Sequence, residues 1–358
     1  MKRGGPVTAG VYDGIVDTVG GTPLVRLDRI SARSGLEVYA KVERFNPGGS
    51  IKDRAARSML LAKIESGELH PLRSVVVESS SGNLAIGLAQ LCRYFDLPFI
   101  CVVDPKTPEH TLAILHSYGA TIEKVTHPDP TSGEFLSARL TRIRELLGST
   151  PGAYWPNQYA NPLNPLAHEQ TMGEIADALD GHVDYLFSAV STTGTLLGCA
   201  NYVRRRGLGT RIVAVDAVGS VLFSDEPASY RLIPGYGASV RPALLDRSGA
   251  DEVVHVTDLD CVVACRQLVR LEAVLAGGSS GATVAALDKL APFVPPGSRC
   301  VLIFPDGGDR YLDTIYSDDW VIEQFGDVRH LWKGGWTEGP ETVAAAVAAM
   351  DPMTPAPC

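Results

Sequence analysis

One lysine of this chain stands where its amine could become reactive. Lys52 lies in residues 46–54 (NPGGSIKDR), after a Pro-Gly-Gly turn and just before a helix predicted over residues 54–63. The turn ends a strand predicted over residues 38–43, and Ser50 is a candidate N-cap. The positive end of a helix dipole lowers the pKa of an ammonium group in the first turn. Only the neutral amine is nucleophilic, so this lysine is a candidate for forming a Schiff base.

Three glycine-containing loops accompany the lysine. SSSGN (79–83) follows an apolar strand predicted over residues 74–77, and STTGT (191–195) follows another predicted over 185–190. A third loop, GSSG (278–281), lies downstream. Backbone N–H groups of a loop that opens a helix can bind an anion. Each loop alone could be an ordinary turn, and a lysine at a helix start is most often a solvated surface group, but their ordered combination favours a cofactor site.

These segments resemble the cysteine synthase and cystathionine β-synthase superfamily, the fold-type II pyridoxal-phosphate enzymes. The resemblance is collinear from about residue 17 to residue 312. Within the superfamily, WPNQYANP (155–162), the opening of the 191–195 loop and RLIPG (231–235) resemble one branch more closely. This branch is the N-(2-amino-2-carboxyethyl)-L-glutamate synthases, which make the precursor of 2,3-diaminopropionate for siderophores and peptide antibiotics.

The alternation of short apolar strands with helices predicts parallel sheets wrapped by helices. The predicted strands beyond those already named cover residues 99–103, 121–125, 211–215 and 300–304, and predicted helices cover 85–95 and 111–118. We expect an α/β fold, which the resemblance makes tryptophan synthase β-like, with two three-layer lobes. The active site is expected between the lobes, at the carboxyl ends of strands.

The resemblance also implies how the chain divides. A larger pyridoxal-phosphate-binding lobe would comprise residues 11–46 and 160–326, and a smaller mobile lobe residues 47–159. Residues 327–358 would form a C-terminal tail, with a glycine-containing break at 334–336 and a short alanine-rich helix over 341–350.

For the cofactor, the resemblance assigns a role to each loop. Lys52 would carry pyridoxal phosphate as a Schiff base, and Asn83 would donate to the phenolic oxygen of the cofactor. The cofactor phosphate would be surrounded by Thr192, Thr193, Gly194 and Thr195. Ser279 would meet the pyridine nitrogen, and a serine there leaves the nitrogen essentially neutral. Loss of a β-substituent is then favoured over transamination.

For the substrates, the resemblance implies a clamp on the α-carboxylate formed by Ser80, Ser81, Gly82 and Asn83. Gln158, Tyr159 and Ser191 are further candidate substrate-binding residues. Arg241 could pair bidentately with a carboxylate or a phosphate, although a surface arginine on a loop is an equally good interpretation.

The implied activity is that of a transferase that condenses O-phospho-L-serine with L-glutamate through an aminoacrylate intermediate. Lys52 would remove the α-proton and later return it. The nearest alternative is a cysteine synthase that uses O-acetylserine or O-phosphoserine with sulfide. Three positions depart from the cysteine synthase pattern: Leu84 and Ser80 replace the usual threonines, and Ser191 replaces the usual glycine.

Other classes fit the sequence less well. A cystathionine-forming enzyme is not favoured, because no haem-binding stretch precedes the core and the tail is short. A catalytically silent paralogue would not need a Schiff-base lysine. A nicotinamide-binding Rossmann domain would need a GxGxxG motif after a strand, and the chain has none.

Bulk properties agree with a cytoplasmic enzyme of small-molecule amino acids. The 358 residues are 45% hydrophobic with a net charge of −9, which argues against nucleic acid or an anionic membrane as partner. Residues 1–6 lack the apolar run of a signal peptide, and no segment reaches membrane-spanning length. The resembled enzymes are usually dimeric, so a homodimer is expected.

The cysteines and histidines show no pattern of a disulfide framework or a metal site. The seven cysteines are an odd, scattered set, and the eight histidines show no HxxxH spacing. Cys261 and Cys265 would share one helix face, which makes them a possible metal pair, although cysteines so placed far more often simply pack in the core.

Overall fold

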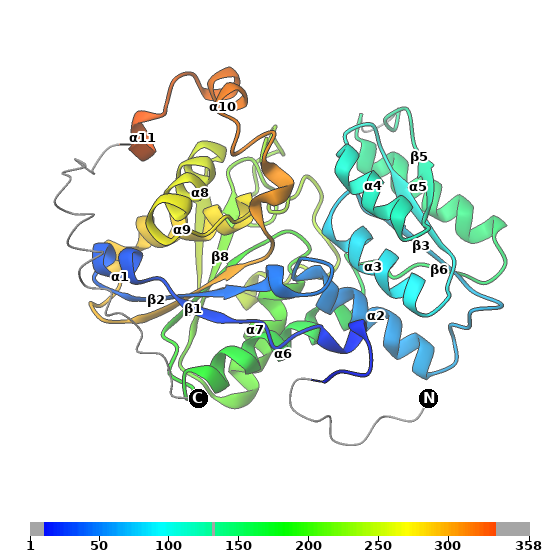
Figure 1. The fold of residues 1–358 in the computed structure, drawn as a ribbon, viewed down its shortest axis with the longest axis horizontal. Coiled ribbons are helices and arrows are strands. Elements are labelled where there is room, and N and C mark those ends of the chain that lie inside the picture. The colour runs from blue at the N-terminus through cyan, green and yellow to red at the C-terminus, as the bar shows by residue number, and fades with distance from the viewer. Residues whose placement is uncertain (1–10, 131–132, 334–358) are drawn as a thin grey trace, which may run out of the picture.

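A computed structural model describes residues 11–130 and 133–333. The predictions made for residues 1–6, 334–336 and 341–350 therefore lie outside the described residues. Figure 1 shows the described chain as two α/β parts side by side, each built around its own sheet.

The larger sheet has six strands in the order β1-β2-β10-β7-β8-β9. These strands are β1 (Leu24–Arg26), β2 (Glu37–Val42), β7 (Tyr185–Ala189), β8 (Arg211–Ala217), β9 (Glu252–Val256) and β10 (Arg299–Phe304). β1 runs antiparallel to β2, and the other neighbours are parallel. β7 and β10 are almost continuously apolar, as expected for strands covered on both faces.

The smaller sheet has four parallel strands in the order β5-β4-β3-β6. They are β3 (Val75–Ser79), β4 (Phe99–Val103), β5 (Thr121–Lys124) and β6 (Ala153–Tyr154). All four lie within residues 47–159, which supports the proposal that this segment forms the smaller lobe.

Helices cover both faces of each sheet. The helices are α1 (Asp28–Ser34), α2 (Lys52–Glu65), α3 (Asn83–Tyr94), α4 (Glu109–Ser117), α5 (Phe135–Ser149), α6 (Leu163–Ala178), α7 (Gly194–Arg206), α8 (Asp258–Glu272), α9 (Gly278–Leu290), α10 (Asp318–Phe325) and α11 (His330–Lys333). Short 3-10 helices are η1 (Ile15–Thr18), η2 (Glu43–Phe45), η3 (Arg247–Gly249), η4 (Ala291–Phe293) and η5 (Gly308–Tyr311).

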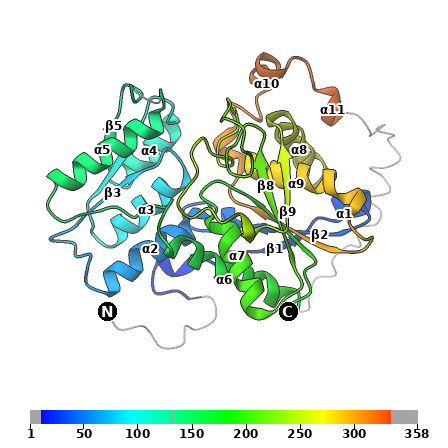
Figure 2. The ribbon, with the colours of Figure 1, turned by 180° about the vertical axis from the view of Figure 1, so that it is seen from behind.

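Four apolar clusters form the layers. On the larger sheet one cluster contains residues of α1, α8 and α9, and another contains residues of α6 and α7, which are seen from behind in Figure 2. On the smaller sheet α2, α3 and α4 share one cluster and α5 belongs to the other. The prediction of two three-layer α/β parts is therefore confirmed.

The predicted strands over 99–103, 121–125, 185–190, 211–215 and 300–304 are all present within two residues of their expected ends. The N-cap prediction was wrong. α2 begins with Lys52 itself and Ile51 occupies the N-cap position, while the Ser50 hydroxyl oxygen accepts the Lys52 N–H at 3.2 Å. None of the helices in residues 11–130 and 133–333 combines the length and apolar character needed to cross a bilayer.

A buried group of four charges fixes α2 to the larger part. The Arg54 side chain is 1% exposed, with Nε 2.6 Å from Glu43 Oε2 and Nη2 2.7 Å from Glu174 Oε2. Lys41 Nζ lies 2.7 Å from the same Glu174 oxygen and donates to the Thr22 carbonyl at 2.6 Å. We call these five residues the Arg54 network. It joins β2, α2 and α6, and α2 packs against α6 on one side and α3 on the other (Figure 1).

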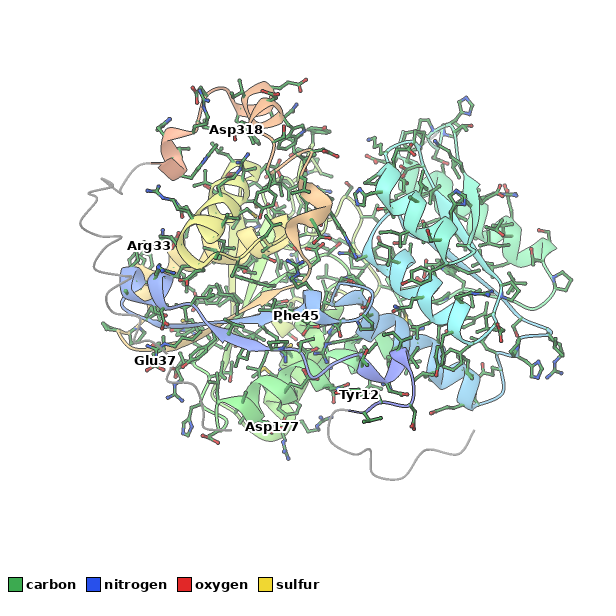
Figure 3. The ribbon with its side chains drawn as sticks, in the orientation of Figure 1. Tyr12, Arg33, Glu37, Phe45, Asp177 and Asp318 are labelled. Atoms are coloured by element: carbon green, nitrogen blue, oxygen red, sulfur yellow. The ribbon has the colours of Figure 1, made fainter. Side chains whose placement is uncertain are left out.

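The ion pairs at the outer surface are exposed to solvent, unlike the buried pair of Arg54 and Glu43. Figure 3 labels Arg33, Glu37 and Asp318 at the periphery of the larger part. Arg33 pairs with Asp288 and Glu37 with Arg299, with all four side chains between 38% and 40% exposed. Solvent screens such pairs, so each contributes little to stability.

Glu43→Ala should lower the free energy of unfolding by about 3–5 kcal/mol, because it leaves Arg54 buried without its closest carboxylate. The matched control is Glu145→Ala, which removes a 57% exposed partner of Arg142 and should cost less than about 1 kcal/mol. Urea unfolding of both variants checks the difference. Equal losses would show that the Arg54 network does not anchor α2.

Candidate active site

Three loops meet where the strands of the larger sheet end. Val42, the last residue of β2, is paired in register with Phe304, the last residue of β10, and β7 lies on the other side of β10. Because these strands are parallel, the segments that follow them emerge at one edge of the sheet. Lys52, the 191–195 loop and Pro305 are brought together in this way.

A pocket at this edge contains most of the predicted cofactor residues. Its lining residues come from the start of α2, the end of β7 with the following loop, and the segment after β10, with Gly235 from a further loop. They are Ile51, Lys52, Ser188, Ala189, Ser191, Thr192, Thr193, Gly194, Thr195, Leu196, Gly235, Ile303 and Pro305.

Burial governs the electrostatics of Lys52. Loss of solvent lowers the pKa of its amine, and the charge of Asp306 acts in the opposite direction. The predicted direction of the pKa shift is therefore confirmed, but the structure gives burial as its main cause rather than the helix dipole. The neighbouring Asp53 accepts the Gly48 N–H at 2.6 Å, and burial raises the pKa of its carboxyl to about 7.

The 191–195 loop is shaped to present N–H groups. Thr193 adopts a left-handed backbone conformation with φ of +66°, which is uncommon for a residue with a Cβ, and α7 starts at Gly194. Asn164 Nδ2 donates to the Thr192 hydroxyl oxygen at 3.2 Å and to the Gln158 carbonyl at 2.8 Å. A Cβ on Gly194 would lie 2.3 Å from the Asn164 side chain, so only glycine allows this approach. The loop suits an anion at the helix N-terminus.

Ser279 lies beside Gly235, which lines the pocket. It lies in the first turn of α9, is buried, and a Cβ on Gly235 would be 3.9 Å from its hydroxyl oxygen. Gly235 itself has a φ of +96° and lines the pocket. Ser279 is therefore a neighbour of one lining residue but is not itself in the lining, and its role at the cofactor stays a prediction.

The predicted substrate loop precedes α3 in the smaller part. The Ser80 hydroxyl oxygen accepts the N–H groups of Gly82 and Ala85, both at 3.3 Å, so this side chain shapes the loop. Ser81 and Gly82 are half-buried, and Asn83 opens α3. A role for this loop in binding a substrate carboxylate stays a prediction.

Two residues that the sequence analysis missed hold Asn83. Its Nδ2 donates to Asp306 Oδ2 at 2.7 Å, and Arg310 Nη1 donates to its Oδ1. Both partners follow β10. The signal was present in the sequence, because a Pro-Asp-Gly-Gly run directly follows the apolar strand, as the other site loops follow theirs.

A second polar cluster surrounds Gln158 and Tyr159. Burial raises the pKa of the Tyr159 phenol, with the guanidinium of Arg139 opposing and the carboxylate of Glu78 adding to the shift. Glu78 is 1% exposed, and its Oε1 accepts the Trp155 indole N–H at 2.9 Å. Burial raises the pKa of the Glu78 carboxyl to about 7. Glu78 and Arg139 were also missed from the sequence.

The structure does not bring Arg241 to the pocket lining. Its Nε donates to the Val221 carbonyl, and its Nη2 donates to the Ser224 carbonyl and to Asp225, with half of the side chain exposed. These contacts fit the surface-loop interpretation. Its role in substrate binding stays a prediction without support from this geometry.

Metal and disulfide chemistry find no support in residues 11–130 and 133–333. No cluster of three metal-ligating side chains occurs in that part of the chain, and its six cysteines are free and buried. Cys261 and Cys265 share α8, where the Cys265 thiol packs against Gly281 of α9. The packing interpretation fits both residues.

Comparison with known proteins gives a consistent result. Residues 15–306 match the family model described as pyridoxal-phosphate dependent enzyme. The chain is 50% identical over 308 residues to N-(2-amino-2-carboxyethyl)-L-glutamate synthase of Ralstonia nicotianae, covering 86% of this chain and 90% of that protein. It is 46% identical over 315 residues to the synthase of the same name from Cupriavidus metallidurans, covering 87% and 92%. The crystal structure of a cysteine synthase from Entamoeba histolytica is 28% identical with a TM-score of 0.80, covering 94% and 100%.

The buried Glu78 predicts a pH dependence of stability. Its folded pKa of about 7 exceeds the ordinary 4.5, so the folded protein holds a proton that the unfolded chain releases, and stability falls as pH rises from about 4.5 to 7. Glu78→Gln removes this titration. The decrease in the free energy of unfolding between pH 5 and pH 7 should therefore be smaller by about 1–2 kcal/mol in the variant. Urea unfolding at the two pH values measures it, with Glu145→Gln as an exposed control. An unchanged fall would show that Glu78 ionises normally in the folded protein.

Proposed function

Because the chain belongs to the family of pyridoxal-phosphate dependent enzymes, we propose that it joins O-phospho-L-serine to L-glutamate. The products are N-(2-amino-2-carboxyethyl)-L-glutamate and phosphate. The observation that carries the proposal is the pocket in which Lys52, Ser191 and the 192–195 loop, which suits a phosphate at the N-terminus of α7, lie together. The names of the two curated relatives support glutamate as the acceptor.

The donor set of the pocket fits pyridoxal phosphate. The N–H groups at the start of α7 and the threonine hydroxyls suit its phosphate, Ser279 suits its pyridine nitrogen, and Lys52 supplies the amine for covalent attachment. When bound, the cofactor withdraws electrons from the α-carbon of an attached amino acid, which makes the α-proton acidic and a β-substituent able to leave.

Lys52 Nζ is the proposed proton carrier. Burial lowers the pKa of this amine, so a larger fraction is neutral and able to accept a proton near neutral pH. It takes the α-proton of phosphoserine and returns a proton to the same carbon after the new bond has formed. Replacing it removes both the point of cofactor attachment and the base.

The bond changes demand polar groups around the substrates. The Cβ–O bond of phosphoserine breaks with its electron pair going to phosphate, and a bond forms from Cβ to the glutamate nitrogen, whose proton passes to solvent. We propose that the Ser191 hydroxyl, in the pocket lining, donates to the leaving phosphate. The 80–83 loop would hold the α-carboxylate at the N-terminus of α3.

Sulfide is the alternative acceptor. The fold similarity to a cysteine synthase favours the same β-replacement with a smaller nucleophile. Leu84 and Ser191 are the positions that argue for the larger, charged acceptor, because they depart from the cysteine synthase pattern.

The wider setting is also part of the proposal. The product would supply 2,3-diaminopropionate for a siderophore or a peptide antibiotic, and the enzyme would act in the cytoplasm as a homodimer.

The test supplies the cofactor-loaded enzyme with phosphoserine, acetylserine, glutamate and sulfide together and identifies products by mass spectrometry. We expect the glutamate adduct with one phosphate released per adduct. Ser191→Gly should shift donor use from phosphoserine towards acetylserine by about tenfold, the effect of one lost hydrogen bond to a charged group. Lys52→Ala is the control without the attachment site and should give no adduct.

Cysteine as the sole product would overturn the acceptor assignment in favour of the cysteine synthase alternative. An unchanged donor preference in Ser191→Gly would remove this hydroxyl from the phosphate site while leaving the acceptor assignment in place.

A further inference from the structure

The Asn83 carboxamide is held at both ends by residues that follow β10. Asp306 Oδ2 accepts from Asn83 Nδ2 at 2.7 Å, and Arg310 Nη1 donates to Asn83 Oδ1. The two partners are 223 and 227 positions away in the chain. Asn83 belongs to the smaller part, whereas its partners follow a strand of the larger sheet.

These partners leave the amide one orientation. Asp306 Oδ2 acts as an acceptor here, since it also accepts from the Tyr311 hydroxyl, and a guanidinium only donates hydrogen bonds. Rotating the Asn83 amide by half a turn would therefore place its oxygen against Asp306 and its nitrogen against Arg310, which loses both bonds. The nitrogen carries two hydrogens, and Asp306 takes one of them. The other N–H is then directed by the same geometry and can donate to a ligand oxygen.

Asp306 is itself fixed. It is 2% exposed, and the Tyr311 hydroxyl donates to its Oδ2 at 2.7 Å. Its backbone pairs with Ser50, two residues before Lys52, and Pro305 lines the pocket. A Cβ on Gly277 would lie 1.9 Å from Asp306 Oδ1, so glycine is required beside it. The carboxylate therefore has little room to move away from Asn83.

Arg310 connects Asn83 to the turn that precedes Lys52. Its Nη2 donates to the Gly48 carbonyl at 2.7 Å. Gly49 has a φ of +83°, and a Cβ there would lie 2.8 Å from the same guanidinium nitrogen. One rigid fork thus contacts the start of α3 and the turn before α2 together.

We propose that Asp306 and Arg310 are positioning residues that aim the Asn83 N–H at the phenolic oxygen of the cofactor and hold α3 against the turn that carries Lys52. This inference rests on the part of the proposed function in which Asn83 contacts the cofactor. Neither residue needs to touch a substrate for this role.

The readout is the bound cofactor itself. The visible absorbance of lysine-bound pyridoxal phosphate responds to hydrogen bonding at its phenolic oxygen, and cofactor affinity can be measured by equilibrium dialysis without turnover. Asn83→Ala comes first and should shift the absorbance. An unshifted spectrum would contradict the assigned contact of Asn83 and overturn the inference with it, leaving the choice of substrates to the product analysis.

Asp306→Ala and Arg310→Met should each shift the absorbance in the same direction as Asn83→Ala and weaken cofactor binding by about tenfold. Asp306→Asn, which keeps an acceptor oxygen for Asn83 Nδ2, should recover most of the spectrum and also covers the case in which the alanine variant fails to fold. Arg310→Lys keeps the charge but lacks the two guanidinium nitrogens that reach Asn83 and Gly48, so it should restore only part of the wild-type spectrum.

The matched control is Tyr316→Phe. Tyr316 donates to the Ala276 carbonyl at 2.6 Å and is not hydrogen-bonded to Asn83, so loss of its hydroxyl perturbs the same region without touching the amide. Thermal melting follows the stability of every variant. A shifted spectrum in Asn83→Ala but not in the Asp306 and Arg310 variants would overturn the inference. Equal spectral shifts in Tyr316→Phe would do so as well, because they would reduce the effect to general loosening.

Discussion

The position of Lys52 depends on the Arg54 network. A guanidinium can be buried only if carboxylates accompany it, and here Glu43 and Glu174 approach Arg54 from η2 and α6. Arg54 is two residues from Lys52 on the same helix, so fixing its guanidinium also fixes the helix start. Lys41 brings the charges to two positive and two negative, which allows the group to lie in the interior. The Lys52 amine is thus anchored to the larger sheet.

Much of the fold could be predicted from the sequence because its strands are locally decided. Segments such as Phe99–Val103 and residues 300–304 are continuously apolar and bounded by polar or glycine-rich residues, which is typical of strands in parallel sheets. β6 was missed because it has only two residues. β9 was missed because its more buried residues alternate with exposed ones, so it lacks a continuous apolar run. The Ser50 cap was wrong because the bridge from Ser50 to Asp306, a long-range contact, fixes that residue instead.

The residues of the candidate site also fall into those that local sequence predicts and those that only the folded structure reveals. Lys52 and the 191–195 loop could be predicted because each follows a strand within its own segment of sequence. Asp306, Arg310 and Glu78 could not, because their importance comes from partners on other elements. Arg310 acquires a role only when folding brings it to Asn83, and Glu78 acquires its raised pKa only through burial. Arg241 illustrates the converse, since its chemistry suited a carboxylate but the fold engages it with the 221–225 segment.

We propose that this pocket binds pyridoxal phosphate through Lys52. The most direct measurement is to load the protein with the cofactor, reduce it with borohydride, digest it and locate the pyridoxyl group by mass spectrometry. We expect the group on the peptide that contains Lys52, while Lys41, buried against Glu174, stays unmodified. A pyridoxyl group on another lysine, or none after reduction, would contradict it.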